Sequence, residues 1–76
     1  IFMKLHQLRY FQCLAHYLHY RKVSEALYIS QPTLSFAIKE LEKELGVALF
    51  KKEGRTISLT GEGKTFLNML QKAYKF

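Results

Sequence analysis

The chain is 76 residues long and basic, with twelve Lys and Arg against six acidic residues, a net charge of +6 and a pI near 9.6. This length allows one domain with a small core, the single cysteine rules out a disulfide within the chain, and no apolar run approaches the roughly 18 residues that a membrane span requires. We therefore expect a cytoplasmic domain with no membrane partner, whose basic surplus favours nucleic acid as its polyanionic partner.

Two amphipathic helices are predicted first, over residues 5–18 and 22–28. The apolar side chains of the first recur at a spacing near 3.6 residues and are Leu5, Leu8, Phe11, Cys13, Leu14, Ala15 and Leu18. The second places Val23, Ala26 and Leu27 on one side. A helix this short needs packing against its neighbours to persist.

A third helix is predicted over residues 31–45. Ser30 is a good N-cap, and Pro32 suits a first turn whose backbone N–H groups have no helical partners. Gly46 supplies the left-handed residue that ends the helix. One buried stripe is expected at Leu34, Ile38, Leu41 and Leu45.

The first turns of this third helix are more polar than a cap requires. Away from the buried stripe lie Gln31, Pro32, Thr33, Ser35, Phe36 and Lys39. In a major groove, Gln pairs with adenine, hydroxyls pair with several bases, and apolar groups touch the thymine methyl. The helix N-terminus itself favours phosphate. We interpret this surface as a base-reading one, with ordinary solvent exposure as the alternative.

A wing is predicted after Gly46, where the apolar period changes. Two short strands, LFKK and ISLT, flank a turn at Glu53, Gly54 and Arg55. Gly54 permits a tight turn, and Arg55 is expected to project from its tip.

The last predicted helix starts at the N-cap Thr60, contains Gly63 as a minor flaw, and runs to the last residue. Its apolar face is formed by Phe66, Leu67, Leu70, Ala73 and Tyr74. Because little chain remains to cover this face, we expect a second copy to cover it in a homodimer.

Three motifs in this order carry a family resemblance: LRYF at residues 8–11, SQPTLSFAIKELEKELGVALF at 30–50, and ISLTGEG at 57–63. Over residues 5–74 the chain resembles the N-terminal DNA-binding domain of the LysR-type transcriptional regulators. The resemblance implies a mainly α, winged helix-turn-helix fold with a three-helix core, a two-stranded wing and a C-terminal linker helix.

The resemblance also implies a domain division and partners. Residues 3–59 are expected to form the DNA-binding domain and residues 60–76 the linker helix that pairs two subunits. The partner is expected to be double-stranded DNA that carries an interrupted inverted repeat. A small-molecule effector would bind a C-terminal domain that is absent here, and no cofactor, metal or enzymatic activity is expected. Ile1 and Phe2 precede Met3, and we expect them not to belong to the natural domain.

Carried over by position, the family's recognition contacts fall on Gln31, Pro32, Thr33, Ser35 and Phe36, with Lys39 next along the helix. The wing contact falls on Arg55, and backbone phosphates are expected at Arg21, Lys22, Lys51 and Lys52. Four features depart from the family pattern, one of them a pair of residues. Phe36 replaces a common Arg or Gln, which favours apolar contact with thymine, and Lys52 replaces a common Arg. Val23 and Ser24 replace an Ala pair, and His19 replaces a capping Ser, which changes packing and capping.

Other interpretations stay open at this point. A helical protein-interaction module explains the apolar last helix equally well but not the basic surplus beside a polar first turn. Cys13 is either a buried thiol or a reactive one. His16 and His19 lie one turn apart but lack further metal ligands, and Glu40 and Glu44 are interleaved with lysines, as in a solvated face. The aromatics of LRYF and HYLHY are either core residues or base-stacking platforms.

Overall fold

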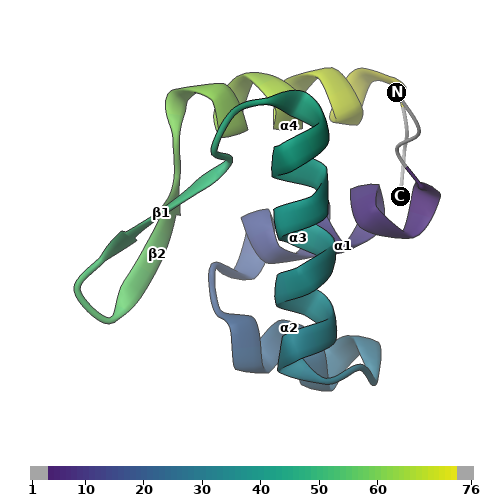
Figure 1. Ribbon diagram of the computed structural model, residues 1–76, viewed down its shortest axis with the longest axis vertical. Helices are drawn as coiled ribbons and strands as arrows, with labels where there is room; N and C mark the ends of the chain where they lie inside the picture. Colours follow the sequence, from purple (N-terminus) through teal and green to yellow (C-terminus); the bar gives the residue numbers. More distant parts are fainter. Residues whose placement is uncertain (1–3, 74–76) are drawn as a thin grey trace.

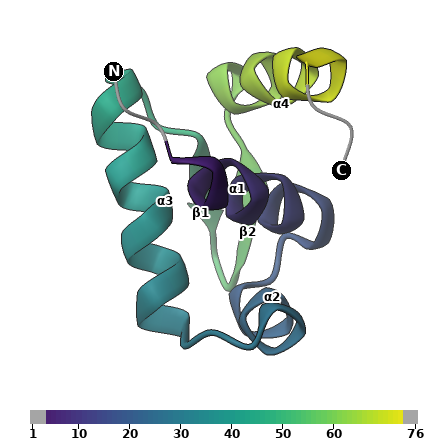
Figure 2. The same cartoon turned by 90° about the vertical axis from the view of Figure 1, so that its right-hand side faces the viewer.

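The computed structural model describes residues 4–73, which form four helices and one two-stranded sheet. The elements in chain order are α1 (Leu5–Tyr17), α2 (Tyr20–Leu27), α3 (Gln31–Leu45), β1 (Phe50–Glu53), β2 (Thr56–Leu59) and α4 (Gly61–Ala73). α2 and the start of α3 lie at one end of the molecule, and α4 crosses the other end, as Figures 1 and 2 show. The predicted winged helix-turn-helix is confirmed. The predictions for residues 1–2 and Tyr74 lie outside the described residues.

α3 matches its predicted bounds. The Oγ of Ser30 accepts from the backbone N–H of Thr33 at 3.1 Å, which caps the first turn. Gly46 ends the helix with φ of 72°, and its N–H donates to the Glu42 carbonyl at 2.8 Å.

The first two helices differ from their predicted bounds at the junction between them. α1 stops at Tyr17 because Leu18 takes a left-handed conformation, with φ of 53°. α2 starts at Tyr20, two residues before the predicted start, because Nδ1 of His19 accepts from the N–H of Lys22 at 3.2 Å and caps the helix. Of the three residues predicted to share one side of α2, Val23 is buried and Leu27 half-buried, whereas Ala26 is exposed.

Phe11 is the centre of the core and is fully buried. Its ring lies 5.5 Å from the ring of Phe50 in the wing and 5.2 Å from that of Phe66 in α4. The other buried apolar residues of this core are Leu8, Leu14, Ala15, Val23, Leu34, Ile38, Leu41, Leu49 and Leu70. Leu5, predicted on the apolar face of α1, is 57% exposed because it stands at the first position of the helix, outside this core. Phe11 of α1 therefore packs against both the wing and α4.

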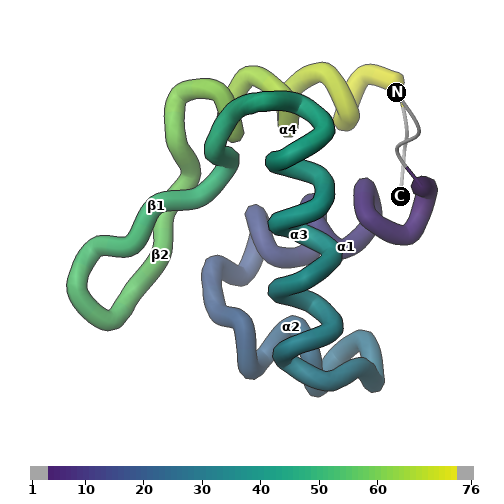
Figure 3. Tube along the Cα trace, in the orientation of Figure 1, coloured from purple at the N-terminus to yellow at the C-terminus, as the bar shows by residue number. Residues whose placement is uncertain are grey.

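The wing is an antiparallel pair that projects from the helices, as the tube in Figure 3 shows. Phe50 pairs with Leu59, and Glu53 pairs with Thr56 across a turn in which Gly54 has φ of 66°. Both strands are displaced by one residue from the prediction, because the N–H of Leu49 bonds to Glu42 instead of to the ladder and the ladder extends to the Glu53–Thr56 pair.

Two anchors fix the wing to the helices. The Oε2 of Glu42 in α3 accepts from the N–H groups of Leu49 at 2.7 Å and Phe50 at 3.3 Å. At the other strand, Thr60 Oγ1 donates to the Ala48 carbonyl at 2.6 Å and accepts from the N–H of Gly63 at 2.9 Å. The direction of the wing is therefore set by α3 and by the cap of α4.

The chain itself covers part of the apolar face of α4 that is predicted to pair with a second copy. Phe66 packs on Phe11, Leu67 is half-buried against the core, and Leu70 is only 5% exposed. α1 and β2 supply this cover, since both contact α4. Of the predicted dimerisation residues that the structure describes, only Ala73 is exposed.

Candidate nucleic-acid interface

Three elements converge on one cleft of about 240 Å³ at the wing side of the molecule. Arg21 comes from the first turn of α2, Gln31 from the first position of α3, and Arg55 from the wing turn. The cleft is completed by Leu18, His19, Tyr20, Thr56 and Ile57. The structure therefore brings together a predicted phosphate contact (Arg21), a predicted base contact (Gln31) and the predicted wing contact (Arg55), which are far apart in the sequence.

His19 is one of the cleft residues that the sequence did not predict as part of the site. Its Nδ1 accepts the N–H of Lys22, so the proton of the neutral ring is on Nε2. His19 is exposed, so its Nε2–H is a donor available to the surroundings. The only sequence signal for His19 was that it replaces the capping Ser of the family pattern.

Tyr20 adds no charge to the cleft at neutral pH. Burial, and next the negative charge of Glu42, raises the pKa of its phenol. The charged groups of the cleft are therefore cations, which suits an anionic ligand.

The first turn of α3 is exposed at Gln31, Pro32 and Thr33. The hydroxyls of Ser30 and Thr33 lie 2.7 Å apart and share one hydrogen bond. The Thr33 hydroxyl is therefore partly engaged by the cap. Gln31 supplies the amide side chain of this turn. Ser35 is half-buried.

Phe36 lies apart from the wing cleft. Its side chain is 66% exposed and lines a second hollow of about 380 Å³ between α3 and the start of α1, together with Thr33, His6 and Tyr10. Lys39 is exposed farther along α3, beside Lys43. The predicted recognition residues thus spread around α3, and the structure does not gather them at one point.

The wing lysines occupy opposite faces. Lys52 pairs with Ile57, which packs on the core, and Lys51 pairs with Ser58 on the outer face. Lys51 is also 4.0 Å from Glu53, an ion pair with both side chains more than half exposed. Such a pair is worth at most about 1 kcal/mol, so it leaves Lys51 able to contact another anion.

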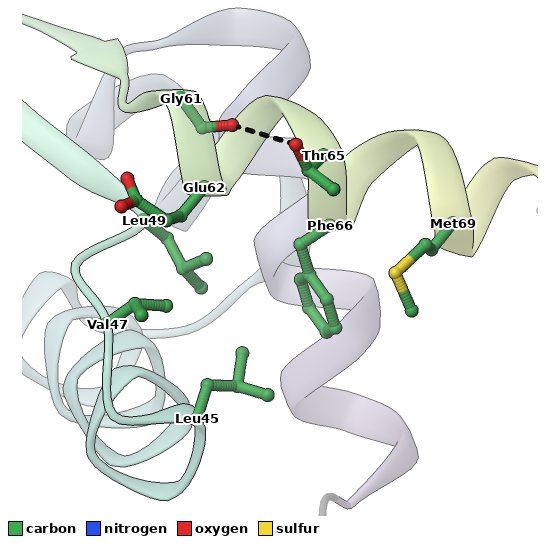
Figure 4. Close-up of a pocket in the computed structure, with 8 residues that line it drawn as sticks. All are labelled: Leu45, Val47, Leu49, Gly61, Glu62, Thr65, Phe66 and Met69. Carbon is green, nitrogen blue, oxygen red and sulfur yellow. Dashed lines mark hydrogen bonds between the residues drawn. The ribbon is translucent and has the colours of Figure 1, made fainter.

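A separate apolar groove of about 690 Å³ lies between the end of α3 and α4 (Figure 4). Its lining residues are Leu45, Val47, Leu49, Gly61, Glu62, Thr65, Phe66 and Met69. Met69 is 59% exposed and Val47 37% exposed. The helical periodicity does not predict this groove, because Met69 lies outside the predicted apolar face.

The alternatives considered from the sequence find little support in residues 4–73. No three His, Cys, Asp or Glu side chains gather there as metal ligands, and no helix there is long and apolar enough to cross a membrane. Phe11 and Tyr10 of the LRYF motif are buried and half-buried, as core residues are, whereas in HYLHY Tyr20 is half-buried and Tyr17 is 54% exposed. Burial raises the pKa of Cys13, which disfavours the reactive thiolate.

The chain matches known proteins over most of its length. The family model described as "Bacterial regulatory helix-turn-helix protein, lysR family" covers residues 5–64. An uncharacterized HTH-type transcriptional regulator of Bacillus subtilis, YybE, is 47% identical over 73 residues, which are 96% of this chain and 25% of that protein. The chain thus spans about a quarter of the length of this relative.

Solved structures give the same result. The oxidized form of Corynebacterium glutamicum OxyR is 34% identical with a TM-score of 0.89, over 96% of this chain and 24% of that one. A complex of the BenM DNA-binding domain with catB site 1 DNA is 37% identical with a TM-score of 0.87, over 93% of this chain and 76% of that one.

Proposed function

Because the chain belongs to the LysR family of bacterial helix-turn-helix regulators, we propose that it binds double-stranded DNA sequence-specifically, with the start of α3 in the major groove and the wing in the adjacent minor groove. The observation that carries this proposal is the cationic cleft, where Arg21, Gln31 and Arg55 meet. A DNA strand that passes between α3 and the wing would meet an amide for a base edge and two guanidinium groups for phosphate. The relatives, which are named transcriptional regulators, support a binding role and not an enzymatic one.

The contacts divide into two kinds. The cations, Arg21, Lys22, Lys51, Lys52 and Arg55, supply affinity and register through phosphate. Gln31 supplies discrimination, since its amide can form two hydrogen bonds to adenine. Phe36 supplies an apolar contact with a thymine methyl farther along the groove.

Replacing Gln31 with Ala tests the base-reading half of the proposal. The variant should lose about 1–3 kcal/mol on the preferred duplex and little on random duplex. Fluorescence anisotropy on both DNAs measures the difference. Equal loss on both would remove Gln31 from the base contacts.

Replacing Lys52 with Ala is the matched control for phosphate contact. This variant should bind all sequences more weakly, and the slope of log K against log salt should fall by about 1. An unchanged slope would remove Lys52 from the phosphate contacts.

For the dimer, we propose that a second copy pairs along α4 and covers the apolar groove. Met69 and Val47 are exposed beside Leu45 and Phe66, and so offer apolar surface that the chain does not cover. This pairing uses the side of α4 that carries Met69, whereas the core-facing side that carries Leu70 is occupied. Two α3 helices held at a fixed separation would require an interrupted inverted repeat.

The charge variant Met69→Lys tests this pairing in sedimentation equilibrium. It should shift the chain toward monomer, whereas Gln71→Lys, about 160° around the helix, should leave the association constant unchanged. Equal behaviour of the two variants would contradict pairing through the groove.

A further inference from the structure

Tyr28 stands in the turn that joins α2 to α3, and it combines two unusual properties. Its side chain is 95% exposed, the highest exposure of any large apolar residue in the described chain. Its backbone is left-handed, with φ of 57° and ψ of 41°. A bulky residue in this conformation is an outlier, because the β-carbon crowds the backbone there.

Hydrogen bonds hold this conformation in place. The N–H of Tyr28 donates to the Glu25 carbonyl at 3.3 Å, and the N–H of Ile29 donates to the Ser24 carbonyl at 3.0 Å. This is the helix ending that glycine or asparagine usually provides. The turn therefore fixes the direction in which the Tyr28 side chain leaves the backbone.

Packing within the chain does not explain why tyrosine occupies the position. Leu18, the other described non-glycine residue with positive φ, is half-buried and lines the wing cleft, so its side chain gains contacts. The Tyr28 ring gains almost none. Strain that the surrounding fold does not repay points to a role outside the folded chain.

The position of the turn indicates what the side chain meets. Tyr28 precedes the cap Ser30 by two residues and Gln31 by three, at the end of the molecule that carries the start of α3 (Figure 1). If α3 enters a major groove by its N-terminus, the preceding turn lies over the rim of that groove. The rim of a groove is lined with phosphates.

We propose that the Tyr28 hydroxyl donates a hydrogen bond to a DNA backbone phosphate at the rim of the major groove. This inference rests on the proposed function and adds an uncharged positioning contact to its cationic ones. Tyrosine hydroxyls are among the groups that bind DNA phosphate oxygens. Because the phenol is neutral, it adds affinity without replacing a condensed cation.

Two variants test the proposal. Tyr28→Phe removes only the hydroxyl, so affinity should fall about five- to tenfold on preferred and random duplexes alike, with the salt slope unchanged. Tyr28→Gly relieves the backbone, so Tm should rise by about 4–8 °C while affinity falls at least as far. Opposite movement of stability and affinity is not expected of a merely structural residue. Tyr17→Phe, which removes another exposed phenol from the end of α1, should bind like the wild type.

Each contrary result has a distinct meaning. If Tyr28→Phe binds as the wild type does, the hydroxyl contact is overturned, even if Tyr28→Gly binds more weakly. A loss confined to the preferred duplex overturns the phosphate assignment in favour of a base contact. If the wild type shows a preferred duplex but Tyr28 variants have no effect, this inference alone fails, whereas a wild type that binds no duplex overturns the proposed function as well.

Discussion

Gly63→Ala should destabilise the domain because α4 lies against the backbone of Leu49, the residue before β1, at this position. A β-carbon at Gly63 would clash with the Leu49 carbonyl oxygen and would press on the Leu59 side chain. That same carbonyl accepts from the N–H of Thr60 at 3.0 Å, and Thr60 caps α4. The backbone that must move is therefore fixed by hydrogen bonds on both sides.

The magnitude follows from this overpacking. Inserting one methyl group into a closely packed site costs about 1–3 kcal/mol, and in a domain of this size 1 kcal/mol corresponds to roughly 4–8 °C in Tm. We expect Tm to fall by about 5–20 °C, measured by far-UV circular dichroism with urea denaturation as a second measurement.

Gly61→Ala is the matched control, two residues earlier in the same helix. Nothing lies within 4 Å of a β-carbon there, and Gly61 does not have positive φ. Alanine should therefore stabilise the domain by about 0.5–1 kcal/mol. A Gly63→Ala variant as stable as the wild type, or the same change in both variants, would refute this reasoning.

Three further predictions concern other anchors of the fold. Glu42→Ala removes the acceptor of two backbone N–H groups at the start of the wing and should cost about 1–3 kcal/mol in urea denaturation, while Glu42→Gln, which keeps one oxygen, should cost less. His19→Ala removes the cap of α2 and should lower the free energy of unfolding by about 0.5–1.5 kcal/mol. His19→Asn supplies a usual capping residue and should be at least as stable as the wild type. An equal loss of stability in both variants would exclude the capping role of His19. Burial raises the pKa of Cys13, so at neutral pH Cys13 should react with iodoacetamide more slowly than the cysteine of a short peptide. In urea its reaction rate should approach that of the peptide. Equal rates for Cys13 and the peptide in buffer without urea would contradict the burial of Cys13.

The fold was largely predictable from local signals. α3 matches its predicted bounds because a cap, a proline, an apolar stripe and a glycine stop all agree. The start of α2 was not predictable in this way, because His19 caps the helix through a ring nitrogen and histidine is not among the usual capping residues. Gly63 looked like a flaw because its close approach to Leu49 is a tertiary contact that no local pattern contains.

The candidate site was predictable only in part. Gln31, Arg21 and Arg55 could each be selected by residue type and motif position, but their meeting in one cleft depends on how the wing folds back beside α2. Helical periodicity identifies the apolar face of α4 without indicating how much of that face the chain itself covers. Phe11 packs against Phe66 on that face, whereas Met69, on another side of the helix, is exposed.

The most direct test of DNA reading is a binding selection of this chain on a pool of random duplexes at moderate salt, with sequencing of the retained DNA. We predict enrichment of an interrupted inverted repeat whose half-sites are lost from the profile of Gln31→Ala. Retention without enrichment would reduce the chain to a basic domain that binds phosphate. Absence of any retention would contradict DNA binding and would favour a protein-interaction module built around the groove at Met69.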